Sequence, residues 1–226
     1  MNRPAMQPED IGRTIAAAIL ERRLVPGQRL NELELSRLLG SSRSMIRFAL
    51  MDLHQDGLVA FEANRGAFVA KPTLEEAHQL FEAIAAIERS AVDIVLAAPQ
   101  LPSLDALRDA HRRQLKARAR GHARLSDELA LAFHAELVDL TANPLLVDTH
   151  RKLLLRYRVV TAVFKTELDY CTLEDHHGEL IELLECGAAS KLRRLVDAHW
   201  RLVIRGHVSV QDDVPEDLAE ALRLVQ

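Results

Sequence analysis

The chain has few cysteines and few aromatic residues, and it lacks any long uninterrupted apolar run. Its two cysteines, Cys171 and Cys186, do not form the dense pattern of a secreted disulfide scaffold, which predicts a reducing cytoplasm. No apolar run approaches the ~18 residues that span a bilayer, so we expect no membrane partner. The first residues, MNRPAMQPEDIGR, lack the apolar stretch of a signal peptide, which also favours a cytoplasmic location.

The composition is that of a helical globular protein. Of the 226 residues, 48% are hydrophobic and 27% are charged, which allows a packed core and excludes wholesale disorder. Aromatic residues make up 4%, and abundant Ala, Leu, Arg and Glu favour helix. Residues 1–72 hold ten Lys/Arg against eight Asp/Glu, whereas the remainder holds nineteen against twenty-five. The sign of this asymmetry suits an N-terminal domain that meets a polyanion.

Residues 1–72 show three helical patterns followed by a hairpin pattern. The first helix is expected over 9–23, the second begins after Asn31, and the third begins after Ser41 or Ser42 and reaches about Gln55. Two short β-prone runs, 58–61 and 67–70, then flank a loop that contains glycine. This order predicts a winged helix-turn-helix domain with a small β-hairpin wing.

Residues 73–226 show helical patterns throughout. A capping box, Thr73 to Glu76, opens a long helix to about Ala98, and the last long helix ends near Gly206. A short extra helix is expected within 215–225. The breaks between the remaining helices carry cap residues, namely Ser103, Ser126, Asn143 and Thr172. We therefore predict a mainly α protein, with an all-α helical bundle as its C-terminal domain.

The third helix carries residues suited to reading DNA. Arg43 and Arg47 are four apart and share a helical face, from which arginine pairs with guanine in the major groove. Ser42 and Ser44 are placed for phosphate contacts at the helix start. The alternative is that the two arginines form a solvated face.

The hairpin tip extends the predicted DNA surface. Asn64 and Arg65 are placed to reach the neighbouring minor groove, and Gly66 permits close approach of the backbone. An arginine at the tip of a wing beside a helix-turn-helix favours DNA binding over the alternative that Arg43 and Arg47 only form a solvated face.

The stretch PGQRLNELELSRLLGSSRSMIRFALMDLHQDGLVAFEANRGAFV resembles the DNA-binding domain of the GntR transcription factors. The residues that carry the resemblance are Pro26-Gly27, Arg29-Leu30, Leu35, Leu38, Gly40, Ser42-Arg43, Arg47, Ala49-Leu50, Leu53, Gly57-Leu58-Val59, Arg65-Gly66 and Val69. It implies that Arg43, Arg47 and the Arg65-Gly66 tip contact DNA. The chain departs from the family where Met45 replaces a usual proline, Phe48 a usual glutamate and Ser41 a usual hydrophobic residue.

Three histidines in the C-terminal domain have the chemistry of metal ligands. His134, His177 and His199 are expected on three different helices, and a helical bundle can direct all three inward. Neutral imidazole binds zinc, nickel and similar ions. The alternative is that these histidines are buried with hydrogen-bond partners, or exposed.

The helical region is similar to the FCD effector domain of the FadR subgroup, with the helix number of the VanR-like branch. Phe133-His134, Ala142-Asn143-Pro144, His177 and His199 carry this resemblance. It implies that the three histidines bind a divalent metal, with zinc or nickel favoured. The fourth family ligand is an aspartate, and here that position is Ala130, which leaves coordination to water, to an effector, or to Asp127.

A second departure concerns the effector. The family often has an arginine facing the effector pocket where this chain has Ile84, so capture of a carboxylate would need another cation. Arg156 and Arg158 are candidates, against the alternative that each is a plain surface arginine.

The sequence thus predicts a DNA-binding transcription regulator whose operator binding responds to a small-molecule effector, an organic acid being favoured. A homodimer on a palindromic operator is expected, because a two-fold protein matches two half-sites. The alternatives are a metal-dependent enzyme built on the three histidines, and a DNA-binding protein without an effector. No general base stands at a motif spacing from the histidines, which argues against the enzyme.

Overall fold

The computed structural model describes residues 7–166, 168, 170–210 and 218–223. The chain forms two compact units, and each is described by itself. The first unit contains the described residues of Met1–Leu74, of Leu155–Lys165 and of Val208–Gln226. The second unit contains Glu75–Leu154 and Thr166–His207.

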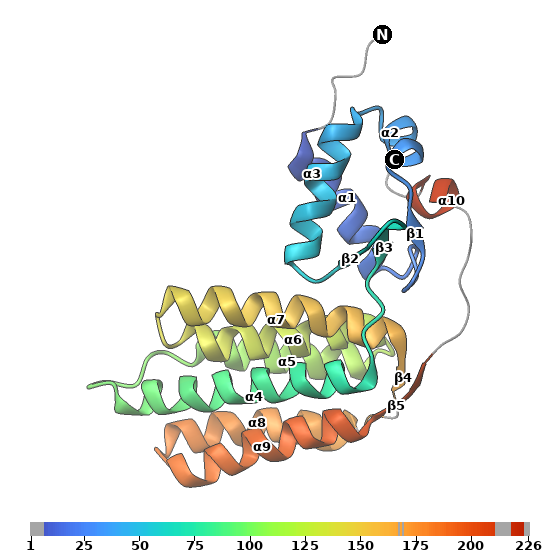
Figure 1. Ribbon diagram of the computed structural model, residues 1–226. Helices are drawn as coiled ribbons and strands as arrows, with labels where there is room; N and C mark the ends of the chain where they lie inside the picture. The colour runs from blue at the N-terminus through green and yellow to red at the C-terminus, as the bar shows by residue number, and fades with distance from the viewer. Residues whose placement is uncertain (1–6, 167, 169, 211–217, 224–226) are drawn as a thin grey trace. The chain divides into compact units, whose positions relative to one another are not determined.

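Residues 7–69 of the first unit form the three predicted helices and the predicted hairpin, with a short strand added between the first two helices (Figure 1). The elements are α1 (Pro8–Leu20), β1 (Arg29–Leu30), α2 (Glu32–Leu39), α3 (Arg43–Gln55), β2 (Val59–Glu62) and β3 (Gly66–Val69). Helix α1 packs on α3, and Ile11, Ile15 and Leu50 at their facing sides are buried. The 3.6-residue spacing of these apolar side chains explains both the helices and the core between them.

The wing is an antiparallel sheet with the strand order β1-β3-β2. Strands β2 and β3 form the predicted hairpin, in which Val59 pairs with Val69 and Glu62 with Gly66. Strand β1 was not predicted, because a strand of two residues shows no period. It pairs with the edge of β3 that faces away from β2, and Arg29 lies opposite Phe68.

Six long helices follow, and Figure 1 shows them running in broadly the same direction or its reverse. They are α4 (Leu74–Ala97), α5 (Asp105–Ala119), α6 (Ala123–Asp139), α7 (Pro144–Val163), α8 (Tyr170–Glu185) and α9 (Ala189–Arg205). Helices α5 and α6 pack together, as do α8 and α9, and α5 also packs on α8. The helical bundle therefore agrees with the predicted fold class.

Helix caps agree with the sequence in part. The Asn143 side chain accepts hydrogen bonds from the main-chain N–H groups of Leu145 at 3.1 Å and Leu146 at 3.4 Å, as the cap prediction requires. The prediction for Ser126 was wrong, because α6 already begins at Ala123 and Ser126 is buried within it. The predicted cap at Thr172 was wrong as well, since α8 begins at Tyr170.

Two short strands lie among the helices. Strand β4 (Phe164–Thr166) pairs with β5 (His207–Val210), although the sequence predicted helices alone in this region. The two strands have three and four residues and lie far apart in the chain, so the sequence shows no local alternation that would predict them. Of the extra helix predicted over 215–225, the structure describes α10 (Leu218–Arg223), and the other residues lie outside the described part.

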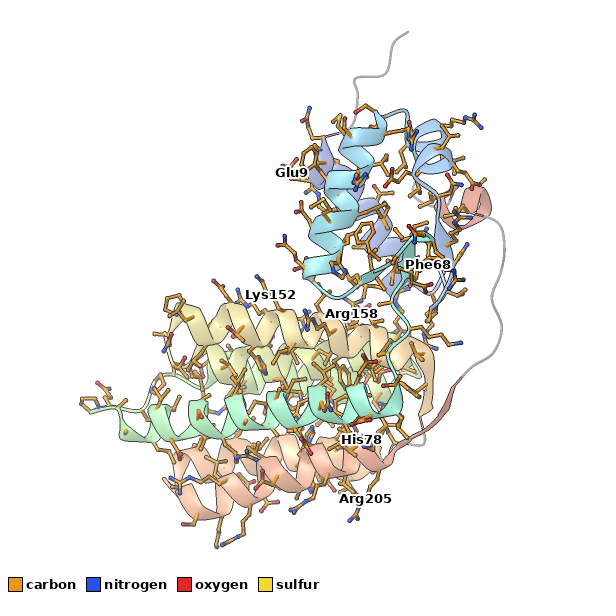
Figure 2. The ribbon with its side chains drawn as sticks, viewed as in Figure 1. Glu9, Phe68, His78, Lys152, Arg158 and Arg205 are labelled. Carbon is orange, nitrogen blue, oxygen red and sulfur yellow. The ribbon has the colours of Figure 1, made fainter. Side chains whose placement is uncertain are left out.

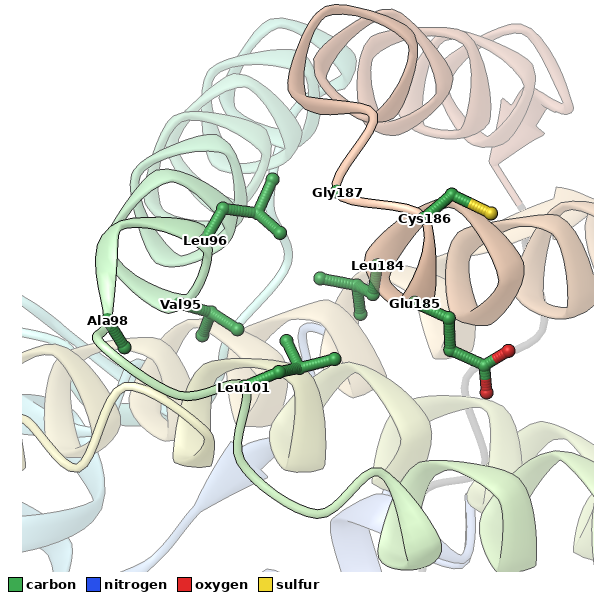
Figure 3. A pocket seen from close by; sticks show the side chains of 8 residues that line it. All are labelled: Val95, Leu96, Ala98, Leu101, Leu184, Glu185, Cys186 and Gly187. Carbon is green, nitrogen blue, oxygen red and sulfur yellow. The ribbon is translucent and has the colours of Figure 1, made fainter.

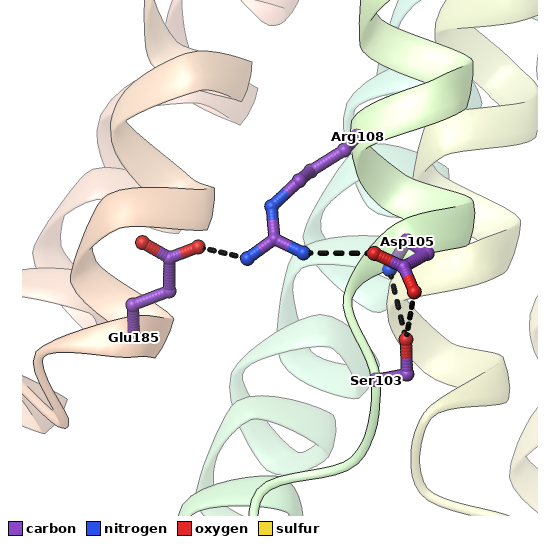
Figure 4. A network of polar contacts seen from close by, with 4 residues as sticks. All are labelled: Ser103, Asp105, Arg108 and Glu185. Carbon is purple, nitrogen blue, oxygen red and sulfur yellow. Dashed lines mark hydrogen bonds and ion pairs between the residues drawn. The ribbon is translucent and has the colours of Figure 1, made fainter.

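One end of the bundle is joined by a polar network between α5 and α8 (Figure 4). The Arg108 guanidinium forms ion pairs with Glu185 and, at 3.1 Å, with Asp105. The Ser103 hydroxyl accepts a hydrogen bond from the Asp105 main chain at 3.2 Å. Because the arginine is exposed, water and salt screen these pairs, and they orient the helix ends more than they stabilise them.

A hollow with both apolar and polar lining residues lies beside this network, between the end of α4 and the end of α8 (Figure 3). Val95, Leu101 and Leu184 are among its lining residues, and Cys186 stands at its edge. None of the three histidines lines it. Among the described residues, no helix has the length and apolarity needed to cross a bilayer.

Candidate functional site

The turn between α2 and α3 places the predicted DNA-reading residues at a helix start. Gly40 has a φ of 62°, a left-handed conformation that glycine adopts freely, and it ends α2. The Ser42 hydroxyl then caps α3 by accepting a hydrogen bond from the Met45 N–H at 3.3 Å. It also lies 3.0 Å from the Ser44 hydroxyl. Both hydroxyl groups are therefore exposed at the N-terminus of α3, where phosphate binds favourably.

The two predicted arginines project from the first half of α3. Arg43 and Arg47 are exposed, and Arg43 lies 3.7 Å from Glu32 of α2. A pair at this distance on the surface is weak, so the guanidinium can exchange it for a base edge or a phosphate. Ile46, Ala49 and Leu50 point into the core of the unit and are buried. The exposed face of α3 is thus free of any role in the core.

The wing tip brings the other predicted DNA contacts together. Asn64 has a φ of 62° and Gly66 a φ of 99°, so both adopt left-handed backbone conformations in the tight turn. Arg65 forms an ion pair with Glu62, and its guanidinium lies 5.1 Å from the centre of the Phe68 ring. Phe68 on β3 is labelled in Figure 2. The ring supports the arginine at the tip of the hairpin.

The three predicted histidines meet in the interior of the helical bundle. His134 of α6, His177 of α8 and His199 of α9 are buried, and one ligand atom from each lies within 4.8 Å of the others. The Nε2 atoms of His134 and His177 are 3.3 Å apart. Among the described residues, these three form the group of His, Cys, Asp and Glu side chains close enough to hold one ion.

The hydrogen bonds around His177 fix which nitrogen faces the cluster. Its Nδ1 atom lies 2.8 Å from Oε1 of Gln114, a buried side chain of α5. A carbonyl oxygen only accepts, so Nδ1 carries the proton and Nε2 carries the lone pair. Second partners of this kind set the tautomer of metal-binding histidines.

Glu88 of α4 plays the corresponding part for His134. Its Oε1 atom lies 3.0 Å from Nδ1 of His134, although the ring N–H does not point straight at it, and 3.1 Å from Nε2 of His150. Its Oε2 atom accepts a hydrogen bond from the Trp200 indole at 2.8 Å. Burial raises the pKa of Glu88, but the adjacent His134 and His150 side chains outweigh burial and hold the pKa well below its usual value. The carboxylate is therefore ionised.

The electrostatics of the cluster favour a cation. Burial lowers the pKa of His177 and of His199 well below the usual value, and neighbouring histidines lower it further, so both rings are neutral near pH 7. If Nδ1 of both His134 and His177 is protonated, their Nε2 lone pairs face each other across 3.3 Å. That arrangement is repulsive unless a proton or a cation lies between them.

The residues present fit a divalent metal. Two nitrogens bound to one tetrahedral zinc are about 3.4 Å apart, given bonds of roughly 2.0–2.1 Å, and the Nε2 atoms of His134 and His177 lie 3.3 Å apart. Nδ1 of His199 is buried and has no hydrogen-bond partner among the described residues. A buried polar atom without a hydrogen-bond partner destabilises the fold, and a ligand bound to the ring would offset this cost.

The remaining predicted residues lie outside this cluster. Ala130 is half-buried on α6, and Asp127 is exposed and paired with Arg118 at 3.6 Å, so it is not one of the grouped ligands. Arg156 of α7 donates hydrogen bonds to the main-chain oxygens of Gln55 at 3.0 Å and Asp56 at 3.4 Å. Arg158 is half-buried on the same helix, as labelled in Figure 2. The effector role of both arginines stays a prediction.

Sequence reasoning missed Glu88, His150 and Gln114. For Glu88 a signal existed, because it stands four residues after Ile84 and four before Val92 on the buried face of α4. A charged residue on such a face needs a partner. Its partners are 46, 62 and 112 positions away in the chain, so their identity is not a local property of the sequence.

A winged helix-turn-helix unit and a helical bundle in one chain define the class of DNA-binding regulatory proteins with a second, helical domain. Residues 7–69 match the family described as "Bacterial regulatory proteins, gntR family", and residues 79–202 match the FCD domain. The chain belongs to the GntR family, in the FCD subfamily with FadR-like and VanR-like members. This confirms the resemblance that the sequence carried.

Two relatives are similar in part of their sequence. The Nta operon transcriptional regulator of Aminobacter aminovorans is 33% identical over 135 residues, which are 59% of this chain and 63% of the relative. The HTH-type transcriptional regulator YdhC of Bacillus subtilis (strain 168) is 32% identical over 71 residues, 31% of this chain and 32% of the relative. The match thus spans less than two thirds of either relative. Neither relative is described as an enzyme, and the same holds for both families.

Solved structures share the fold. A GntR transcriptional regulator from Rhodococcus sp. RHA1 has a TM-score of 0.74 at 22% identity, covering 88% of this chain and 95% of that one. Lar of Listeria monocytogenes has a TM-score of 0.61 at 18% identity, covering 99% and 100% of the two chains. E. coli McbR/YncC has a TM-score of 0.65 at 15% identity, covering 86% and 93%. At these identities the likeness concerns the fold alone.

Proposed function

We propose that the protein is a transcription regulator that binds operator DNA through α3 and the β2–β3 wing. The observation that carries this proposal is the exposed face of α3, on which Arg43 and Arg47 stand beside two helix-start hydroxyl groups. Arg43 and Arg47 face base edges, Ser42 and Ser44 face phosphates, and the Asn64 to Gly66 tip enters the adjacent minor groove. Such a protein acts in the cytoplasm, where bacterial DNA is found.

We further propose that the helical domain holds a divalent metal, zinc or nickel, through His134, His177 and His199. Three protein ligands leave a coordination position open, because no carboxylate belongs to the group. When bound, the metal supplies a Lewis acid that binds an anionic oxygen. An organic acid is the effector class that suits this site, since its carboxylate takes the position that Ala130 cannot fill.

We also propose that the protein binds its operator as a homodimer. A dimer with two-fold symmetry presents two copies of α3 to two half-sites of a palindromic operator. The effector changes operator affinity when it binds one arrangement of the two DNA-binding units better than the other.

DNA binding is tested with the full chain and duplexes from its own promoter region, followed by fluorescence anisotropy at several salt concentrations. We expect sequence-dependent binding that weakens as salt rises. Arg43→Ala should weaken the specific complex by about 1–3 kcal/mol. Arg112→Ala on α5 is the matched control, since its side chain is 64% exposed and that of Arg43 is 65% exposed. Equal binding to every duplex would overturn the proposal.

The metal is tested by elemental analysis of the purified protein and of His177→Gln. We expect metal in the wild type and little in the variant, because one of three ligands is lost. His122→Gln, an exposed histidine at the start of α6, is the control and should keep its metal. Near-zero metal in all three proteins, even after incubation with zinc or nickel, would exclude the site.

The effector is tested by thermal shift with a panel of small organic acids, with and without added metal. A ligand that binds the folded protein alone raises the melting temperature by mass action. We expect a stabilising acid whose effect disappears in His177→Gln and whose addition changes operator affinity. A stabilising acid that acts equally on both proteins would separate the effector from the histidines.

A further inference from the structure

The face of α3 that carries the arginines also carries large apolar side chains. Phe48 is 61% exposed and Met51 is 45% exposed. Ser44, Phe48 and Met51 stand at positions i, i+4 and i+7, so they form one stripe on the helix surface. The core of the unit is closed without them, because Ile46 and Leu50 fill the opposite face.

The neighbouring exposed side chains of Phe48 and Met51 gain free energy when a partner removes them from water. The partner that covers this face must also interact favourably with Arg43 and Arg47, which are exposed on the same helix. A second copy of the chain is a poor occupant. In a two-fold contact the same patch meets itself, so the arginines of both copies would be brought together in one interface.

DNA satisfies both requirements. Its phosphates and guanines accept the arginines, and in the major groove each thymine presents an apolar C5-methyl group. A helix that inserts the arginine face into the groove carries Phe48 with it, since Met51 is a helical neighbour of both Arg47 (i,i+4) and Phe48 (i,i+3). A phenylalanine ring that covers the methyl group removes apolar surface from water, which stabilises the complex.

On the basis of the proposed DNA binding, we propose that Phe48, with Met51 beside it, reads the methyl group of a thymine in each operator half-site. A carboxylate at this position would be repelled by the phosphates and would not favour a methyl group. Phe48 therefore gives this chain a preference for thymine at that position of the half-site.

The test first selects binding sequences from a random duplex pool with the full-length protein. Each thymine in the selected duplex is then replaced singly by deoxyuridine, which removes the methyl group and leaves the hydrogen-bonding groups in place. Anisotropy at one fixed salt concentration gives the affinities. We expect one position per half-site where replacement weakens wild-type binding about fourfold, and about sixteenfold when both half-sites are changed.

Phe48→Ala should bind the thymine and deoxyuridine duplexes equally, whereas Leu145→Ala should keep the wild-type difference. Leu145 is the control because it is exposed, at 78%, and lies on α7. Phe48→Glu should bind more weakly than Phe48→Ala. Circular dichroism melts verify that the variants fold, which the exposure of Phe48 predicts.

Three outcomes would overturn the inference. The first is an unchanged deoxyuridine profile in Phe48→Ala, and the second is a selected operator without methyl dependence at any thymine. The third is a Phe48→Ala protein whose oligomeric state changes while its methyl dependence stays. An enriched sequence must appear for the proposed function to stand, so its absence would remove DNA recognition itself rather than the role of Phe48 alone.

Discussion

Nδ1 of His134 lies 3.0 Å from Oε1 of Glu88, and both side chains are buried. Through His150 and Trp200 the same carboxylate also contacts α7 and α9. One residue of α4 thus holds side chains from three other helices at a single point. The orientation of a proposed metal ligand therefore depends on a residue that does not belong to the ligand group.

We expect Glu88→Gln to weaken metal binding by about 10–100-fold, the range found when the outer partner of a metal ligand is lost. Glutamine keeps the size of the side chain but removes the charge that holds His134. Isothermal titration of the metal-free protein with zinc measures the affinity. The rise in melting temperature on adding zinc gives a second readout, which a purely structural role would leave unchanged.

Glu82→Gln is the control for this experiment, because Glu82 is exposed on the same helix. It should leave both the zinc affinity and the zinc-induced rise in melting temperature as they are in the wild type. Equal zinc affinity in Glu88→Gln and Glu82→Gln would contradict the role given to Glu88.

Ala130→Asp should strengthen metal binding. Ala130 stands four residues before His134 on α6, so a carboxylate there shares the helical face of that ligand. The new side chain would occupy the position that we assign to the effector, so binding of the organic acid should weaken. Titration with zinc and then with the acid measures both effects. Tighter binding of both ligands would show that they do not compete for one position.

The pH dependence of the metal-free protein follows from the two neutral histidines. Burial lowers the pKa of His177 and of His199 in the folded state, so below about pH 6.5 the unfolded chain binds more protons than the folded one. Stability is retained above that pH and falls below it, by up to about 1.4 kcal/mol per pH unit for each histidine. The lowered pKa of Glu88 acts in a lower range, as the pH falls below 4.5.

Urea unfolding between pH 7.5 and 5.5, followed by the fluorescence of Trp200, measures this dependence. Trp200 is the single tryptophan of the chain and lies in the helical bundle. His199→Gln removes one of the two groups and should therefore show a shallower fall than the wild type. The same slope in both proteins would mean that His199 does not resist protonation.

Local sequence signals account for the helices, the wing and the caps that were predicted correctly. The Asn31 side chain accepts from the N–H groups of Leu33 at 2.9 Å and Glu34 at 3.2 Å, and this needs only neighbouring residues. The apolar spacing of α1 likewise predicts the burial of Ile11 and Ile15. Helix caps and apolar spacings can be predicted from the sequence because the residues that interact lie within a few positions of one another.

Features that depend on distant partners could not be predicted in the same way. The pairing of β4 with β5 joins segments about forty residues apart, and neither strand is long enough to show a period. Ser126 has the residue type of a helix cap, yet it is buried within α6, which begins three residues earlier. The histidine cluster was found from the family resemblance, whereas its supporting residues Glu88 and Gln114 required the three-dimensional structure.

Arg65→Ala should reduce operator binding differently from Arg43→Ala. Arg65 stands at the wing tip, held by Glu62 and by the Phe68 ring, and it is proposed to enter the minor groove. Arginine there responds to groove width and to the negative potential of A·T-rich steps rather than to one base. We therefore expect Arg65→Ala to lose the preference for A·T pairs beside the half-site and to lower the salt dependence by about one charge. Arg43→Ala should instead relax the choice of one base within the half-site. Anisotropy with duplexes that differ either in the flank or in the half-site separates these effects, and identical profiles for the two variants would show that wing and helix do not read different grooves.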